Sequence, residues 1–265
     1  MNFNQFDELQ STGDLKKDEF RYRQLMIKED VPSNVFYNLG IICAKTGREE
    51  EAINLFKKYI YLEPKSPIAY NNLGLIFIKI QKYDEAIKNF LISLKFKQDS
   101  KTYFNLALTY EEIGKFKKAI YNYKAASKID SKNAEALCNL GNLYYISGNL
   151  KEAKKCLELS IKNKSDLDAA FNNLGLVNMA YGDFKSAKKN FINTLKINPK
   201  NSKAHYNLSN LGNYKIQGKK HLNQLLLNLK LTTSEHEKMY YYFALGKVFE
   251  DKKKHKESFQ YFKKG

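Results

Sequence analysis

Small and large apolar residues alternate along this chain in a pattern that returns about every 34 residues. An Asn-Leu-Gly segment marks each return, with Ala or Ser replacing Gly once each. The third residue of the segment stands at Gly40, Gly74, Ala107, Gly141, Gly175 and Ser209, so the successive steps are 34, 33, 34, 34 and 34 residues. A period of this length is typical of one helix-turn-helix unit. The pattern therefore predicts stacked helical hairpins.

The predicted interior is the same in each unit. If Leu39 and Gly40 are positions 7 and 8, the first full unit begins at Ser33. Small residues at positions 8 and 20 would let helices A and B of a hairpin cross closely, and a large residue at position 24 would fill the gap beside them. Position 20 is Ala52, Ala86, Ala119, Ala153 and Ala187, and position 24 is Phe56, Phe90, Tyr123, Leu157 and Phe191.

Glycine and proline mark the predicted ends of these helices. Position 15 is glycine in four units, as the turn after a helix favours, at Gly47, Gly114, Gly148 and Gly182. Pro64 and Pro199 would end helix B of two units, because proline cannot continue a helix.

These positions resemble the tetratricopeptide repeat (TPR) family. The resemblance covers about residues 33–201 as five regular units. It implies an all-α fold, a right-handed α-solenoid of antiparallel helix pairs whose concave surface is formed mostly by the A helices. Residues 1–32 are predicted to form a degenerate, loosely packed hairpin or cap, in which Asp18 stands where alanine is expected. Residues 202–265 are predicted to form an irregular sixth unit and a final hairpin.

Asparagine recurs at position 6, which faces the groove in proteins that this chain resembles. A primary amide can donate and accept together, so a row of them could hold the backbone of an extended peptide, each pair contributing about 0.5–1.5 kcal/mol. The alternative is that each amide bonds the neighbouring helix. The predicted peptide-binding residues are Asn38, Asn72, Asn105, Asn139, Asn173 and Asn207, with Asn142 and Asn210 at position 9, Tyr145 at position 12, and Lys45 and Lys79 at position 13.

The charge adds a second alternative. The chain has 45 Lys+Arg against 28 Asp+Glu, a net charge of +17, but only Arg21, Arg23 and Arg48 are arginines. A protein that reads nucleic acid would use more arginine, whose planar fork matches phosphates and base edges. Dispersed lysines are typical of solvated helix faces. Binding to protein or peptide is therefore favoured over nucleic acid, and RNA or anion binding remains an alternative.

The sequence predicts no catalytic residue, metal or cofactor, and hence no enzyme activity in this chain. The four histidines lack metal-ligand spacing, and no phosphate loop or nucleophile elbow is present. The chain has no apolar run of membrane-spanning length and no signal-peptide pattern at its start. Three widely spaced cysteines favour a reducing compartment, the cytoplasm.

Residues 202–265 carry a second resemblance, through the segments Tyr242–Lys247 and Ser258–Phe262. They are similar to the region that precedes a sulfotransferase domain in bacterial TPR proteins. This implies, as an alternative function, a substrate-recruiting region whose catalytic domain lies outside this chain. The last hairpin is also predicted to leave Phe259 and Phe262 open, which would favour self-association or the packing of a further domain.

Overall fold

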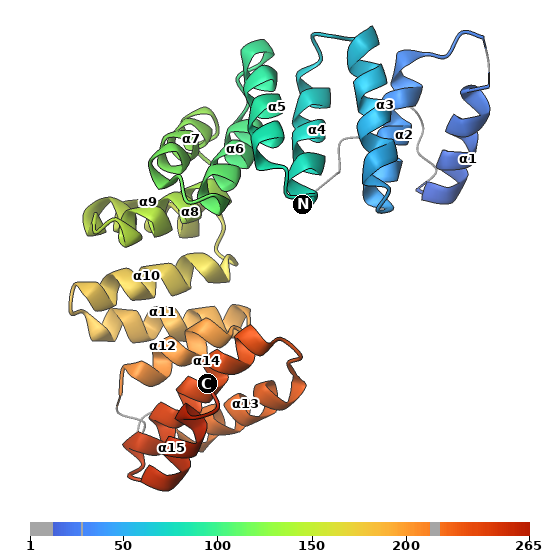
Figure 1. Cartoon of the computed structure of the whole chain (residues 1–265). Helices are drawn as coiled ribbons and strands as arrows, with labels where there is room; N and C mark the ends of the chain where they lie inside the picture. Colours follow the sequence, from blue (N-terminus) through green and yellow to red (C-terminus); the bar gives the residue numbers. More distant parts are fainter. Residues whose placement is uncertain (1–12, 28, 213–217) are drawn as a thin grey trace. The chain divides into compact units, whose positions relative to one another are not determined.

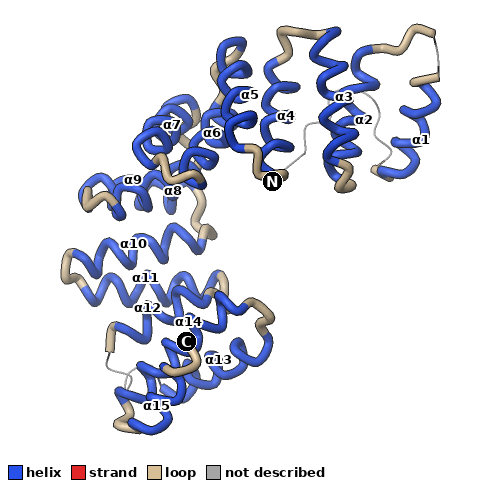
Figure 2. The backbone as a smooth tube through the Cα atoms, in the orientation of Figure 1, coloured by secondary structure: helices blue, strands red, loops and turns tan. Residues whose placement is uncertain are grey.

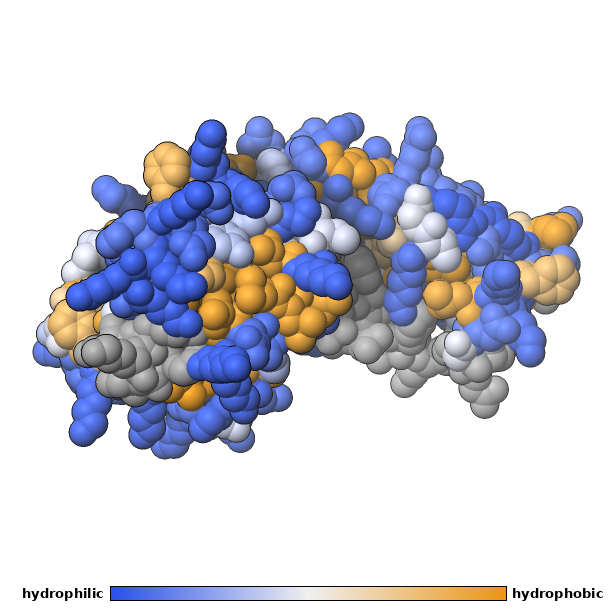
Figure 3. Space-filling view, turned by 90° about the horizontal axis from the view of Figure 1, so that it is seen from below, coloured by the Kyte–Doolittle hydropathy of each residue, from blue (hydrophilic) through white to orange (hydrophobic). Residues whose placement is uncertain are grey.

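The computed structural model describes residues 13–27, 29–212 and 218–265, and this part of the chain is entirely helical, with fifteen helices and no strand (Figures 1 and 2). The predicted all-α class is confirmed. The chain divides into two compact units, Met1–Asp130 and Ser131–Gly265. The face shown in Figure 3 is mostly hydrophilic, as the lysine-rich composition implies, with apolar patches between the polar side chains.

The described part of the first unit consists of one helix followed by three helical hairpins. Helix α1 packs against α2, and the hairpins are α2 with α3, α4 with α5, and α6 with α7. Helices α2, α4 and α6 are the A helices of the first three regular repeats, and α3, α5 and α7 are their B helices. The bounds are α1 Leu15–Leu25, α2 Ser33–Lys45, α3 Glu49–Leu62, α4 Pro67–Lys79, α5 Tyr83–Phe96, α6 Ser100–Glu112 and α7 Phe116–Ile129.

The second unit begins with two regular hairpins, α8 with α9 and α10 with α11, and ends with an irregular group. The short helix α12 packs mainly against α14, which also contacts α13 and forms the last hairpin with α15. The bounds are α8 Ala134–Ile146, α9 Leu150–Asn163, α10 Asp168–Ala180, α11 Phe184–Ile197, α12 Ser202–Asn210, α13 Gly218–Leu231, α14 Glu235–Asp251 and α15 His255–Phe262.

The helices of each hairpin cross as closely as the small residues predict. A methyl group built on Gly74 would lie 2.6 Å from Cε1 of Phe90, and one on Gly141 would lie 2.7 Å from Cγ of Leu157. Phe90 and Leu157 are completely buried. Glycine is therefore required at positions 74 and 141 by the large residue at position 24, because Phe90 and Leu157 have no space to move away.

The turn after helix A adopts a left-handed backbone in every regular repeat. The glycines at position 15 have φ between +71° and +79°. Two turns lack glycine, and there Gln81 (φ +61°) and Lys253 (φ +59°) adopt the same conformation. A side chain in this region costs about 1 kcal/mol, so the hairpin keeps its turn geometry even where the sequence disfavours it.

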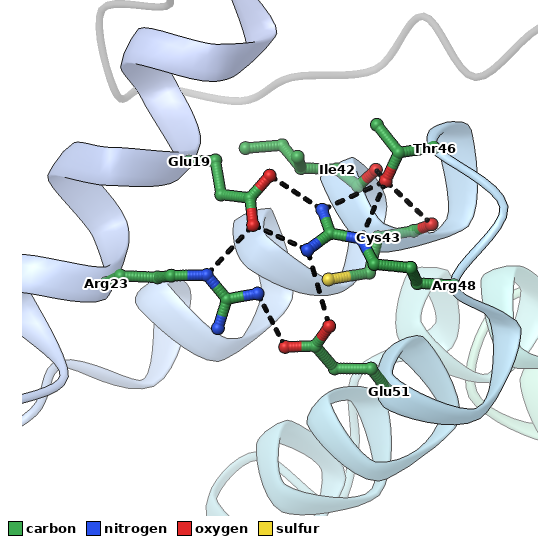
Figure 4. A network of polar contacts seen from close by, with 7 residues as sticks. All are labelled: Glu19, Arg23, Ile42, Cys43, Thr46, Arg48 and Glu51. Carbon is green, nitrogen blue, oxygen red and sulfur yellow. Dashed lines mark hydrogen bonds and ion pairs between the residues drawn. The ribbon is translucent and has the colours of Figure 1, made fainter.

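Two of the three arginines attach α1 to the first repeat (Figure 4). The guanidinium of Arg48 makes two 2.6 Å contacts with the two carboxylate oxygens of Glu19. Arg23 bridges Glu19 at 2.8 Å and Glu51 at 2.7 Å. Hydrogen bonding to Arg48 is the main cause that lowers the pKa of Glu19 to about 2. The bidentate pair thus adds a specific polar link between α1 and the start of α3.

A buried histidine pair lies where the repeat becomes irregular. His205 of α12 and His221 of α13 stack with ring centroids 5.1 Å apart, and Nδ1 of His205 lies 3.0 Å from Nε2 of His221. Nε2 of His205 lies 3.0 Å from the carbonyl oxygen of Pro199. Because a carbonyl only accepts, His205 donates through Nε2, and its Nδ1 must accept from His221. The ring of His205 is therefore neutral in this arrangement, and burial, which lowers the pKa of His221, favours the neutral form of that ring as well.

The last hairpin corrects one expectation about exposed apolar surface. Phe262 stands at position 24 of the final repeat and packs against Gly246, and its ring centroid lies 6.2 Å from that of Phe243. Phe262 is therefore half-buried within the hairpin, while Phe259 is 69% exposed. The prediction that both would lie open was wrong for Phe262, because its ring packs against Gly246 as the ring of Phe90 packs against Gly74.

Replacing Gln81 with glycine should stabilise the first unit. Glycine adopts positive φ without the side-chain clash, and part of this gain is offset by the greater flexibility of the unfolded chain. We expect the free energy of unfolding, measured by urea denaturation, to rise by about 0.5–1 kcal/mol. Gln81→Ala should give no such gain, because alanine keeps the clash. Equal stability of the two variants would contradict the role of backbone strain.

Replacing Arg48 with lysine should loosen α1 while leaving the rest of the unit unchanged. Lysine keeps the charge but cannot make the bidentate contact with Glu19. We expect amide hydrogen exchange in α1 to accelerate by about tenfold, with exchange in α4 and α5 unaffected. The matched control is Arg21→Lys, because Arg21 is exposed. Unchanged protection of α1 in Arg48→Lys would show that apolar contacts alone hold this helix.

Acid should destabilise the second unit through the histidine pair. Burial lowers the pKa of both rings, that of His221 to about 4 from an ordinary 6.5. The folded state resists protonation, so this contribution to stability is complete above pH 6.5 and is lost as the pH falls toward 4. We expect a loss on the order of 2 kcal/mol, measured by urea denaturation across that window. His221→Gln keeps a donor for His205 and should reduce the loss. An identical pH profile would exclude the pair as its source.

Candidate functional site

The A helices stack on one another within each unit, which brings the predicted asparagines into two sets of three. Helix α4 contacts both α2 and α6, and α10 contacts both α8 and α12. The first unit therefore groups Asn38, Asn72 and Asn105, and the second unit groups Asn139, Asn173 and Asn207.

The amide nitrogen of four of these asparagines contacts the preceding A helix, always at position 5 of that helix. Nδ2 of Asn105 donates to Oδ1 of Asn71 at 3.1 Å, and Nδ2 of Asn207 donates to Oδ1 of Asn172 at 3.0 Å. The partner changes but the geometry recurs, with Asn72 to Tyr37 Oη at 3.1 Å and Asn173 to Cys138 Sγ at 3.7 Å. One N–H of each amide thus links successive repeats, as the alternative to peptide binding expects.

The accessibility of the six asparagines is uneven. Asn38 is 1% exposed and Asn207 is 8% exposed. Asn72, Asn105, Asn139 and Asn173 are half-buried. A ligand on the A-helix face could reach these four without a change in the fold, while Asn38 and Asn207 belong to the interior between helices.

The other uncharged residues that were predicted to bind peptide lie on the second unit. Asn142 and Tyr145 are half-buried on α8, one and two turns beyond Asn139 on the same helix. Asn210 is exposed at the end of α12. Asn142 and Tyr145 can therefore extend a surface that includes Asn139, because residues three and six or seven positions apart lie on one helix face.

The two predicted lysines lie at the end of A helices in the first unit. Lys79 forms a 2.6 Å ion pair with Glu49, and its Nζ lies 3.3 Å from the carbonyl oxygen of Ala44. Hydrogen bonding to Lys79 lowers the pKa of Glu49. Lys79 therefore connects two repeats. Lys45 is half-buried, and this burial lowers its pKa.

Cys43 and Cys138 lie buried, one in each unit. Burial raises the pKa of Cys43 and Cys138 to about 12, which keeps both as unreactive thiols. In residues 13–27, 29–212 and 218–265, no group of three or more His, Cys, Asp or Glu side chains is placed to hold a metal ion. None of the helices in these ranges combines the length and apolarity needed to cross a bilayer.

Sequence reasoning identified the asparagines but missed the residues that orient them. Asn71 and Asn172 stand directly before Asn72 and Asn173, and an Asn-Asn pair in a repeat was a usable signal. The role of the first asparagine in each pair depends on the repeat that follows. Its side-chain oxygen accepts a hydrogen bond from the position 6 asparagine one unit later.

Models of tetratricopeptide repeats match four segments of the chain. Three matches are described as "Tetratricopeptide repeat" and cover residues 33–66, 55–88 and 134–166, and one described as "TPR repeat" covers residues 109–146. The helical hairpins described above span all four segments.

Curated relatives share the repeats over part of their length. The chain is 32% identical over 142 residues to human "Protein O-mannosyl-transferase TMTC3", a match that covers 51% of this chain and 15% of that protein. It is 33% identical over 85 residues to "TPR repeat-containing thioredoxin TDX" of Arabidopsis thaliana, covering 32% of this chain and 22% of that protein. The matches thus span less than a quarter of the length of either relative.

Solved structures share the fold. The crystal structure of YrrB, titled "a TPR protein with an unusual peptide-binding site", has a TM-score of 0.58 and 17% sequence identity, and the match covers 69% of this chain and 95% of YrrB. An identity this low carries information on the fold alone. Together, the four repeat matches and the stacked helical hairpins support the chain as a tetratricopeptide repeat protein.

Proposed function

We propose that this chain is a protein-interaction scaffold that holds an extended peptide on its A-helix face through asparagine side chains. The observation that carries the proposal is the half-buried asparagine whose amide nitrogen is already bonded to the preceding A helix, at Asn72, Asn105 and Asn173. The TPR fold is consistent with this protein-interaction role.

The bond to the preceding helix prepares each amide for a ligand. It uses one of the two N–H groups of Asn72 or Asn105, and no hydrogen bond within the described ranges uses the Oδ1 of either residue. The second N–H and the oxygen remain for the C=O and N–H of a peptide backbone. Because the side chain is already held, less conformational entropy is lost on binding. The contact with the neighbouring helix and the contact with a ligand are therefore compatible.

The basic charge supports the second candidate, binding of RNA or another anion. Helix α11 carries four lysines and no acidic residue, at Lys185, Lys188, Lys189 and Lys196. Phosphate contacts would make affinity fall steeply with salt, while neutral amide contacts respond weakly.

The predicted similarity of residues 202–265 to a region preceding a sulfotransferase domain stays a separate prediction. The translated sequence beyond Gly265 would test it.

The asparagine contacts can be tested with a peptide selected against the full chain from a phage-displayed random library. We expect the double variant Asn72→Ala and Asn105→Ala to weaken its binding by about tenfold or more, since two hydrogen-bonding side chains are lost. Isothermal titration calorimetry measures the dissociation constant, and affinity should change by less than about twofold between low and physiological salt.

The control is Asn223→Ala, which removes an exposed asparagine from α13. It should leave the affinity unchanged. A second variant, Asn71→Ala, removes the partner that orients Asn105 and should weaken binding less than the double variant. Unchanged peptide affinity in the double variant, with circular dichroism showing intact helices, would refute the asparagine contacts. Selected peptides that lose affinity steeply with salt would favour the anion-binding alternative.

A further inference from the structure

A second surface of the first unit, separate from the asparagines, forms a deep groove between two B helices. Helices α5 and α7 are its walls, and Tyr103, Leu106 and Tyr110 of α6 lie between them. The groove has a volume of about 990 Å³. Leu106 and Tyr110 are buried, which makes the floor apolar.

The walls present apolar side chains to solvent. Leu91 of α5 is 44% exposed and Tyr121 of α7 is 68% exposed. Ile87 and Ile92 also line the groove from the α5 side. Exposed apolar surface in a concavity is typical of a site where a partner docks.

The rim of the groove is basic. Lys88 and Lys95 stand on α5, and Lys117 and Lys118 on α7, against a single acidic residue, Asp84. The lining therefore carries a net charge of +3. None of the four lysines forms an ion pair with the described residues. Nζ of Lys118 lies 5.4 Å from the ring centroid of Tyr110, so this charge is held over the apolar floor.

The first repeat shows that a basic rim is not common to every B-helix groove of the chain. The corresponding hollow beside α3 has a volume of about 440 Å³, and its lining includes Glu50, Glu51 and Asn54 together with one lysine, Lys58. These three residues stand at repeat positions 18, 19 and 22, where α7 has Lys117, Lys118 and Tyr121. The repeat period therefore places opposite charge and an added aromatic ring at equivalent points of two hairpins.

We propose that this groove binds an acidic amphipathic helix of a partner protein. The charge of the rim requires carboxylates on the ligand, and the floor requires an apolar stripe between them. The walls are helices whose backbone groups are bonded internally, so they offer no edge to an extended peptide. A segment buried here must satisfy its own backbone hydrogen bonds, as a helix does. Apolar anchors spaced three and four residues apart would follow the groove, with acidic residues beside the four lysines.

The test uses the full chain and a labelled peptide of about 16 residues, designed as an amphipathic helix with a leucine stripe flanked by glutamates. Fluorescence anisotropy should show saturable binding, and a matched peptide with lysine in place of each glutamate should not bind. The double variants Lys88→Glu with Lys118→Glu, and Leu91→Ser with Tyr121→Ser, should each weaken binding by about tenfold or more.

The matched control reverses two exposed lysines of the second unit, Lys151→Glu with Lys162→Glu, and should change the affinity by less than about twofold. The double variant Asn72→Ala with Asn105→Ala should also bind the acidic peptide normally, which separates this groove from the asparagine site. Absence of saturable binding, or equal loss in the control, would overturn the proposal. So would tight binding of single-stranded RNA that depends on Lys88 and Lys118 but not on Leu91 and Tyr121, because the groove would then be an anion site.

Discussion

The close crossing of the two helices within each hairpin is the contact on which the other features depend. In the regular repeats, positions 8 and 20 hold only glycine or alanine, as at Gly74 and Ala86, with a large buried residue such as Phe90 beside them. Because both sides of this contact are tightly packed, the two helices of a hairpin are held at close distance. Successive A helices can then stack within a unit, and the B helices are left to form grooves between them.

In the stacked A helices, the asparagine at position 6 uses only part of its hydrogen-bonding capacity. Its amide nitrogen bonds position 5 of the preceding helix, where the acceptor is Tyr37, Asn71, Cys138 or Asn172. At Asn72 and Asn105, no hydrogen bond among the described residues uses the side-chain oxygen or the remaining N–H. A structural role and a ligand-binding role are therefore not competing explanations for this residue, since an amide has enough hydrogen-bonding groups for both.

Arginine and lysine serve different purposes in this chain. Arg48 makes short contacts with Glu19, and Arg23 makes a short contact with Glu51, and these contacts attach α1 to the first repeat. The lysines mostly have no acidic partner in the described ranges and remain on helix faces. A planar guanidinium suits a fixed bidentate contact, while a flexible ammonium suits a solvated or adaptable surface. The lysines on the rim of the α5–α7 groove form such an adaptable surface, and they lie beside an apolar floor.

The sequence alone determined the repeat length, the helical hairpins and the small-to-large contact inside each one, because these depend on residues at constant spacing within a single unit. The tertiary structure decided what happens where a residue departs from the pattern. Gln81 adopts the left-handed turn that glycine occupies elsewhere. Ser160 donates to the carbonyl oxygen of Ala134, but in the third repeat the equivalent residue is Ala126, and Ser100 donates to its carbonyl instead.

Contacts between hairpins also could not be predicted from the sequence. The asparagine partners, the His205–His221 pair and the groove between α5 and α7 each join residues of different helices, and the neighbours differ from unit to unit. A periodic pattern predicts which side chains face inward within a hairpin, but not which side chains of the next hairpin they will meet. That choice depends on how the hairpins stack, and stacking is set by packing across the whole unit.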